Sequence, residues 1–168
     1  TWDKGKLIQL DGRVPFPIQL DALVAELTEA RVVASTSEDD SISGERMHAL
    51  MRLKTYRALC RLPWRDIALV PEWNEMCDAA GEVCDANGKL DHSPEKPPEM
   101  DDERYQQGYK GANNSNLSAG GLMNAVDSFM DDSDPSNIDR IGHRRWCLNP
   151  LMGKTGFGAS NRWSAMWA

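Results

Sequence analysis

Several signals that would place this chain in a large class of proteins are missing from its sequence. No apolar run approaches the roughly 20 residues that a membrane-spanning helix requires. No C-x-x-C pair occurs among the four cysteines, which argues against a zinc knuckle. The net charge of -7 argues against nucleic acid as a partner, because a phosphate backbone selects basic surfaces. No internal repeat is visible, and 168 residues suit a single domain with one sizeable core.

A secretory leader is also missing. The chain opens on Thr1-Trp2, and no charged-then-apolar segment follows. The residues alone do not decide between a removed targeting segment and a fragment cut from a longer protein. A hydrophobic content of 40% and a charged content of 27% are typical of a globular protein in water.

The cysteine spacing excludes one particular disulfide. Cys77 and Cys84 are seven positions apart in one predicted helix, on the same face but about 10 Å apart along its axis. That separation is too large for a bridge between them. Buried cysteines that pack as small apolar residues are therefore favoured, and a disulfide framework is the alternative.

Two regions are expected, an N-terminal extension at residues 1–43 and a domain at 44–168. The extension contains one predicted helix and then a polar, acidic linker over 36–43. The helix is indicated by four apolar residues at helical spacing: Leu20, Leu23, Val24 and Leu27.

The first half of the domain contains two predicted helices. One runs from about 44 to 62 and is stopped by Pro63. The next has Pro71 in its first turn and ends at Asn87-Gly88, a typical C-terminal cap. Its apolar stripe is predicted to belong to the core: Trp73, Met76, Cys77, Ala80 and Cys84.

A later helix is indicated by apolar residues between 122 and 130, with Asn116 or Ser118 as its N-cap. The stretch before it, residues 108–118, is rich in Gly and Asn and lacks periodicity. That stretch is predicted to be a loop.

The last quarter of the chain predicts a β-hairpin. Two apolar runs punctuated by Gly are separated by Ser160-Asn161-Arg162. A loop that ends at Pro150 precedes them, and there His143 is followed by two arginines, which makes it a candidate wall of a site. In the second strand, alternation sends Ser164 and Met166 to one face and three other residues to the opposite face: Trp163, Ala165 and Trp167.

Six short motifs occur in a characteristic order: YRALCRLP (56–63), NGKLDHS (87–93), AVDSFM (125–130), GHRR (142–145), LNP (148–150) and TGFG (155–158). The first two resemble the opening half of a CAP domain, the module of cysteine-rich secretory, antigen 5 and plant pathogenesis-related proteins. The others resemble its bacterial branch. The resemblance covers 44–168. It implies an α+β fold, a three-layer α-β-α sandwich with a central antiparallel sheet, and it implies export.

Many CAP domains have a cleft in which two His and two acidic residues hold a divalent metal. The first His of that set matches His92. The first acid belongs to a Gly-Glu-Asn motif, and Gly111-Ala112-Asn113 stands there instead. The second acid is matched by Asp131 or Asp132, whereas Arg162-Trp163 occupies the place of the second His. At most half of the set survives, so we predict neither a metal nor a cofactor.

A different construction uses His143. If its loop lies beside the same cleft, His92 and His143 form a pair, with Asp131 or Asp132 orienting one ring. The simpler explanation is that His143 anchors its loop by hydrogen bonds. The predicted ligand-binding residues are His92, Asn113, Asp131, Asp132, His143, Arg145 and Trp163.

Three functions follow from the resemblance. The first is a non-enzymatic binding module whose cleft takes a ligand, such as a lipid or sterol, or a protein partner. The second is a hydrolase or peptidase-like enzyme that uses His92, His143 and Asp131 or Asp132. The third is a structural domain with a vestigial cleft, which the absence of a carboxylate at Ala112 keeps open.

Overall fold

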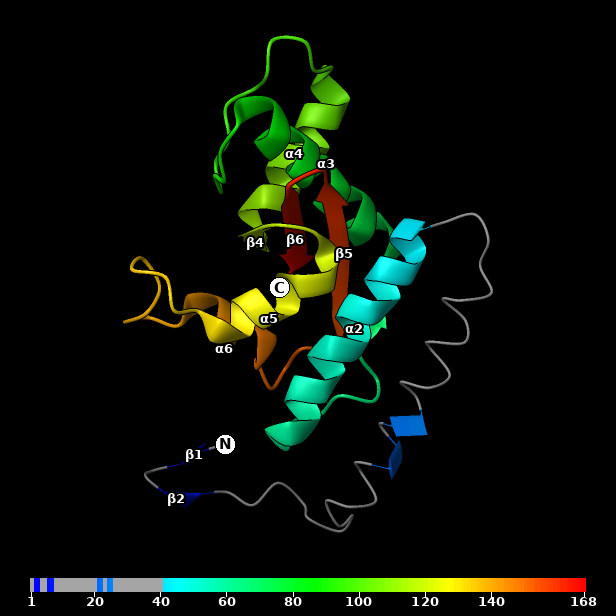
Figure 1. The fold of residues 1–168 in the computed structure, drawn as a ribbon, viewed down its shortest axis with the longest axis vertical. Coiled ribbons are helices and arrows are strands. Elements are labelled where there is room, and N and C mark those ends of the chain that lie inside the picture. Colours follow the sequence, from blue (N-terminus) through cyan, green and yellow to red (C-terminus); the bar gives the residue numbers. More distant parts are fainter. Residues whose placement is uncertain (1, 4–5, 8–20, 23, 26–40) are drawn as a thin grey trace.

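A computed structural model describes residues 2–3, 6–7, 21–22, 24–25 and 41–168. The described part of the chain has a mixed α/β fold with one four-stranded sheet (Figure 1). The predicted linker at 36–43 falls mostly outside the described residues, as do three of the four residues that indicated the N-terminal helix: Leu20, Leu23 and Leu27.

The elements follow one another as β1 (Trp2–Asp3), β2 (Lys6–Leu7), α2 (Ser41–Leu59), β3 (Ala68–Leu69), α3 (Pro71–Asn87), α4 (Asp102–Asn113), β4 (Ser115–Ala119), α5 (Leu122–Asp131), α6 (Gly142–Cys147), β5 (Lys154–Ser160) and β6 (Trp163–Trp167). Strands β1 and β2 form a short antiparallel pair. No helix of the described part combines the length and the apolar character needed to cross a membrane.

The main sheet has the strand order β3-β5-β6-β4. The predicted hairpin is confirmed, because β5 and β6 pair antiparallel around a turn in which Asn161 has a φ of 41°. The expected antiparallel sheet is wrong in one respect: β3 runs parallel to β5. The amide of Val70 donates to the carbonyl of Thr155 at 2.9 Å on this edge. No local turn joins β3 to β5, so only the tertiary structure sets their relative direction.

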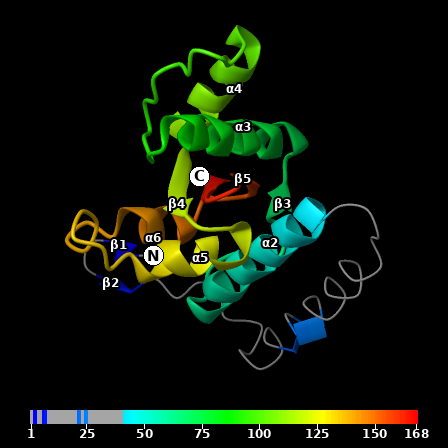
Figure 2. The same cartoon turned by 45° about the horizontal axis from the view of Figure 1, so that its top comes forward.

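The two faces of β5 pack against different helices. Phe157 and Met166 belong to a core cluster that includes residues of α2 and α5. On the opposite face, a Cβ added to Gly158 would lie 2.3 Å from the amide nitrogen of Asp78 in α3. Ala165 packs on that side with Trp163 and Trp167 partly buried around it, as the predicted alternation requires. Figure 2 shows α3 running across these strands.

The region predicted to be a loop at 108–118 is instead the end of α4 followed by strand β4. Its glycines permit close contact rather than flexibility, because a Cβ on Gly111 would lie 1.9 Å from the carbonyl oxygen of Met76. The predicted N-caps were also wrong. Asn116 and Ser118 lie in β4, and α5 has Gly121 at its N-cap.

Several local predictions hold. Pro71 lies in the first turn of α3, and Gly88 caps that helix with a φ of 67°. None of the four cysteines, all in the described part, forms a disulfide. Cys77, Cys84 and Cys147 are buried as expected, whereas Cys60 is exposed because it follows the last turn of α2.

Candidate functional site

A cavity of about 470 Å³ lies where the turn after α3, the junction of α4 with β4, and α6 meet. It brings together His92 and His143, which are far apart in the sequence. The lining is mostly polar and consists of His92, Asn113, Asn114, Ser115, Asn116, Asn137, Arg140, Gly142, His143, Arg145, Trp146 and Ala168.

His92 is held by the C-terminal end of α4. Its Nδ1 lies 2.8 Å from the carbonyl oxygen of Ala112, and because a carbonyl only accepts, Nδ1 donates. The side-chain amide of Asn113 donates back to the carbonyl of His92 at 3.3 Å. The bond to Ala112 defines the tautomer of His92 when it is neutral, whereas the bond from Asn113 holds the backbone of His92. Nε2 of His92 has no partner among the described residues.

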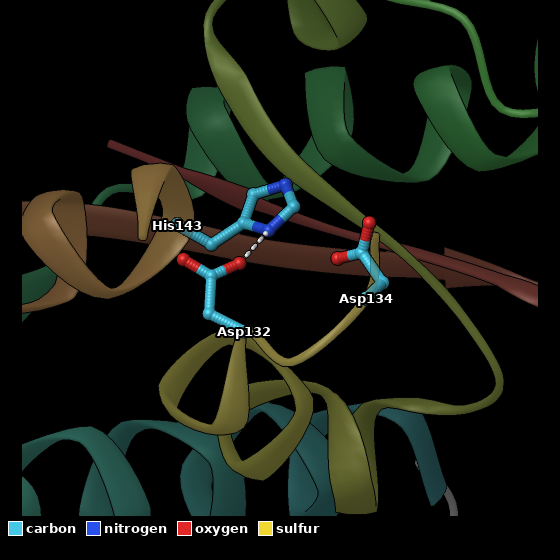
Figure 3. Close-up of side chains that lie close together, drawn as sticks. All are labelled: Asp132, Asp134 and His143. Atoms are coloured by element: carbon cyan, nitrogen blue, oxygen red, sulfur yellow. Dashed lines mark hydrogen bonds and ion pairs between the residues drawn. The ribbon is translucent and has the colours of Figure 1, made fainter. Parts of the chain in front are cut away.

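His143 is held by a carboxylate. Its Nδ1 lies 2.9 Å from Oδ1 of Asp132, and Figure 3 shows the two side chains facing each other. The other oxygen of Asp132 accepts from the backbone amide of Arg144 at 3.2 Å. Asp132 has a side-chain exposure of 0% against 21% for His143. The buried carboxylate accepts from both His143 and Arg144, and it thereby fixes the orientation of the imidazole. Nε2 is the ring nitrogen of His143 that does not contact Asp132.

The backbone at this site is strained at two points. Asp132, just after α5, has a φ of 49°, and Ile141, just before α6, has a φ of 44°. Such left-handed conformations cost about 1–3 kcal/mol in residues other than glycine. The left-handed conformation at Asp132 belongs to the residue whose carboxylate is hydrogen-bonded to His143. Strain of this kind is common at functional sites, where the surrounding contacts maintain it.

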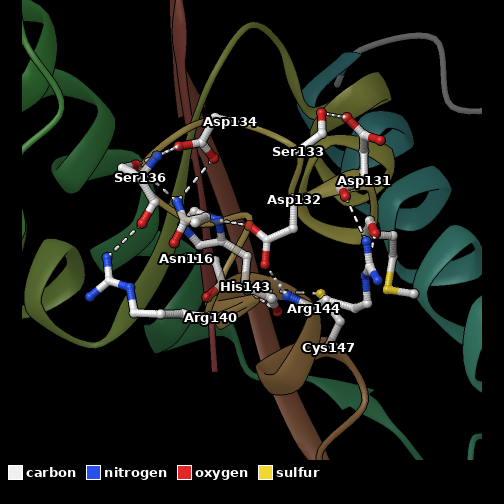
Figure 4. Close-up of polar contacts among 12 residues, drawn as sticks. Asn116, Asp131, Asp132, Ser133, Asp134, Ser136, Arg140, His143, Arg144 and Cys147 are labelled. Atoms are coloured by element: carbon white, nitrogen blue, oxygen red, sulfur yellow. Dashed lines mark hydrogen bonds and ion pairs between the residues drawn. The ribbon is translucent and has the colours of Figure 1, made fainter.

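Arg144 fastens α6 to the end of α5. Its guanidinium donates to the carbonyls of Met130 and Asp131, each at 2.6 Å, as Figure 4 shows for this network. These carbonyls are at the C-terminal end of a helix, where a cation is favoured. The ring of Phe129 lies 5.4 Å from that of His143 and supports it from the core.

Arg57 fastens the other end of α6. Its guanidinium is fully buried and donates to the carbonyls of Cys147 and Asn149 at 2.8 and 2.9 Å. A third bond, to the carbonyl of Pro63, ties the same side chain to the link after α2. Burial lowers the pKa of Arg57 from its ordinary value. The YRALCRLP motif therefore acts at the cleft indirectly, by holding its α6 wall.

The structure brings most of the predicted site residues together. His92, Asn113, His143 and Arg145 line the cavity, and Asp132 lies behind His143. Two predicted residues lie elsewhere. The carboxylate of Asp131 is bonded to the Ser133 hydroxyl and does not line the cavity.

Trp163 is the second predicted residue that lies elsewhere. It pairs with Ala119 and Ser160 at the end of β6 away from the cavity, and it packs with the cluster under α3. The sequence interpretation missed Asn116, Asn137, Arg140 and Trp146 as lining residues. The asparagine-rich stretch before Asn116 was the available signal, but its composition predicts a loop and an N-cap rather than a cavity wall.

The described residues do not fit the metal centre of CAP domains. Ala112 stands where a carboxylate is required, its side chain is buried, and its carbonyl accepts from His92. Asp132, Asp134 and His143 do place ligand atoms within 4.8 Å of one another. However, both Asp132 oxygens accept bonds from His143 and Arg144, and those of Asp134 accept bonds from Ser136 and Asn137. Figure 3 shows Asp134 beside the imidazole without a bond to it.

Among the described residues, neither Cys147 nor Ser115 beside the cavity is an activated nucleophile. Burial raises the pKa of the Cys147 thiol to about 12, so it is protonated at neutral pH. The Ser115 hydroxyl contacts the Cys77 sulfur at 3.5 Å rather than a histidine. The arrangement can therefore bind, orient and exchange protons through imidazole, but it offers no thiolate or activated hydroxyl.

Comparisons with models of protein families, with curated proteins and with solved structures found no match to this chain.

Proposed function

We propose that residues 44–168 form a CAP-type domain, an α-β-α sandwich of three layers, that acts as a non-enzymatic binding module. The observation that carries this proposal is that His92 and His143 line one polar cavity. The packing of α3 on one face of β5, and of α2 and α5 with Phe157 of the other face, supports the layered fold. Export is proposed on the same resemblance.

The lining favours a polar ligand over a lipid or sterol. Eight of the twelve lining residues carry an amide, imidazole or guanidinium group, and Trp146 and Ala168 are the main apolar members. Such groups need hydrogen-bond partners that an acyl chain or sterol ring does not supply. A second hollow of about 430 Å³ is more apolar, with the stacked rings of Trp73 and Trp167 in its wall, but it contains neither histidine.

The test is a ligand screen by amide NMR on the 168-residue chain. One set of compounds consists of small carboxylates, amides and sugars, and the other of sterols and fatty acids in cyclodextrin. We expect polar compounds to shift the amide signals of His92, Asn116 and Arg145 and to be recovered unchanged. His143→Gln should weaken such binding, whereas His48→Gln, on an exposed face of α2, should not.

Two results would contradict this function. Shifts confined to the hollow around Trp73, produced by the lipid set, would place the ligand elsewhere. A cleft that responds to neither set would favour the structural domain with a vestigial cleft.

A hydrolase or peptidase-like enzyme is the second candidate, and one observation favours it. The 2.9 Å contact between His143 and the buried Asp132 is the geometry that orients an imidazole for general acid–base work. If this candidate is correct, the chain hydrolyses peptides or activated esters, and His143→Ala lowers the rate by about 100-fold or more. If the binding module is correct, wild type and variant hydrolyse these substrates no faster than buffer.

A further inference from the structure

The charge of the cleft lining is opposite to that of the chain as a whole. The chain has 26 acidic residues against 19 Lys and Arg, yet none of the described residues that line the cavity is acidic. Its ionisable side chains are His92, His143, Arg140 and Arg145. On this basis, and resting on the proposed binding function, we propose that the cleft binds an acidic saccharide, a sugar ring that carries hydroxyls and a carboxylate.

The two arginines provide the site for the carboxylate. The guanidinium of Arg145 has no hydrogen bond or ion pair with any other residue that the structure describes, and the residue is exposed at the cavity. Arg140 donates one bond, to the carbonyl of Ser136, and keeps its remaining donors. An arginine fork matches a carboxylate in geometry and charge.

Among the described residues, neither nearby aspartate forms an ion pair with Arg140 or Arg145. Asp132 is buried and accepts from His143 and from the amide of Arg144. Asp134 is turned into its own chain segment, where it accepts from the backbone of Ser136 and the side chain of Asn137, as seen in Figure 4.

The asparagines of the lining indicate that the ligand carries hydroxyl groups. The amide groups of Asn113, Asn114 and Asn116 donate to the carbonyls of His92, Lys110 and His143. Each amide group therefore uses at least one of its two N–H donors within the chain, whereas no described residue donates to its Oδ1 oxygen. Acceptors that face a cavity call for O–H or N–H donors on the ligand. A hydroxylated ring supplies several such donors from one rigid body, which a simple carboxylate or phosphate does not.

Trp146 offers the apolar surface that a sugar also needs. It lies on α6 at the cavity and is 52% exposed, although large aromatic side chains are usually more buried. The C–H face of a pyranose ring can lie against an indole and remove both from water. Arg145 and Trp146 both line the cavity, so one ligand can contact both.

The test is calorimetric titration of the 168-residue chain with acid–neutral pairs: trigalacturonate and its methyl ester, sialyllactose and lactose, and cellobiouronate and cellobiose. Inorganic phosphate is a fourth arm. We expect at least one acid to bind about 10-fold more tightly than its neutral partner.

Arg145→Gln should weaken the binding of that acid about 10-fold without affecting the neutral sugar, and Trp146→Ala should weaken the binding of both. Both residues are exposed, so these variants should fold. Arg65→Gln, an exposed arginine outside the lining, is the matched control and should change nothing.

Three other results would contradict the acidic-saccharide inference, each in a different way. Equal affinity for an acid and its neutral partner, lost in Trp146→Ala, would overturn the acidic class and leave cleft binding intact. Phosphate binding as tight as that of the acids, unaffected by Trp146→Ala, would reduce the site to a simple anion site. Binding of none of the acids would overturn this inference, and the NMR screen decides separately whether the proposed function also fails.

Discussion

The interface between α3 and β5 and the cleft beside α6 differ in the size and polarity of their side chains. At the interface, Gly156 and Gly158 remove side chains so that two backbones meet, and a Cβ on Gly156 would lie 2.6 Å from the Cβ of Trp73. At the cleft, long or polar side chains such as Arg145 and Asn116 line a space that stays open. One region is closed by the absence of side chains, and the other is kept open by polar side chains that retain unused hydrogen-bonding groups.

This difference indicates that the α3–β5 interface stabilises the fold and that the cleft is the region suited to binding. Close backbone contact buries apolar surface without leaving polar groups unsatisfied, so it stabilises the domain. The wall of the cleft is supported by buried Asp132, and both Asp132 and Ile141 have left-handed conformations whose strain offsets part of the stability that the wall contributes. The comparison can be tested by substitutions whose expected effects range from large to small.

The largest effect is expected for Gly158→Ala. The added Cβ would lie 2.3 Å from the amide nitrogen of Asp78, and backbone atoms of α3 do not yield easily. We expect the free energy of unfolding to fall by about 3 kcal/mol or more, as measured by urea denaturation. Gly153→Ala is the control, because nothing lies within 4 Å of its added Cβ, and it should be neutral or stabilise by about 0.5 kcal/mol. Equal stability of the two variants would contradict the closed interface.

Arg57→Met tests the anchoring of the cleft wall. The substitution keeps the buried bulk but leaves the carbonyls of Cys147 and Asn149 without their donor. We expect a loss of about 2 kcal/mol in the free energy of unfolding. The amide signals of α6 should shift more than those of α3. Arg65→Met, at an exposed arginine whose guanidinium lies 4.5 Å from the Trp64 ring, should cost at most about 1 kcal/mol. Uniform shifts over both regions would argue against a specific anchoring role.

Thiol labelling compares the two regions directly. Burial raises the pKa of Cys77 in α3 and of Cys147 in α6 to about 12, so each thiol reacts only after the structure opens. In a Cys60→Ser background, we expect the free energy of the opening that exposes Cys147 to be about 1 kcal/mol lower than that of the opening that exposes Cys77. The reason is that α6 has 6 residues and α3 has 17. Faster labelling of Cys77 would reverse the comparison.

The smallest effect is expected outside both regions, at Asp127 on α5. The hydrogen bond from Arg52, together with that from Tyr56, lowers the pKa of Asp127. A lowered pKa means that the bonded carboxylate stabilises the fold above the unfolded-state pKa of about 3.9, and that this contribution is lost as pH falls through the folded-state value. Asp127→Asn should therefore destabilise by about 0.5 kcal/mol at pH 7, because the pair is partly exposed. The two proteins should converge in thermal unfolding once the pH has fallen below the folded-state pKa of Asp127.

Part of this fold could be predicted from local signals. Pro71 and Gly88 mark the ends of α3 because their backbone preferences act within one turn. The alternation along β6 likewise predicted that Ala165 and Met166 face opposite sides. Helix α4 was missed because Gly108 and Gly111 suggest a loop unless one knows that α3 lies against them. The parallel direction of β3 was missed for a similar reason, since it depends on a distant strand.

The candidate site divides in the same way. Residue types and order identified His92, Asn113, His143 and Arg145 as candidates, and all four line one cavity. The choice between Asp131 and Asp132 depended on which carboxylate turns inward, and the left-handed turn at Asp132 decided it.

By itself, the sequence determined the two ends of α3, the faces of its hairpin and the residues capable of proton exchange, because these depend on neighbours in the chain. The tertiary structure decided which side chains share the cleft, since segments from α3 to α6 must fold against one another before Asn116, Arg140 and Trp146 meet the two histidines.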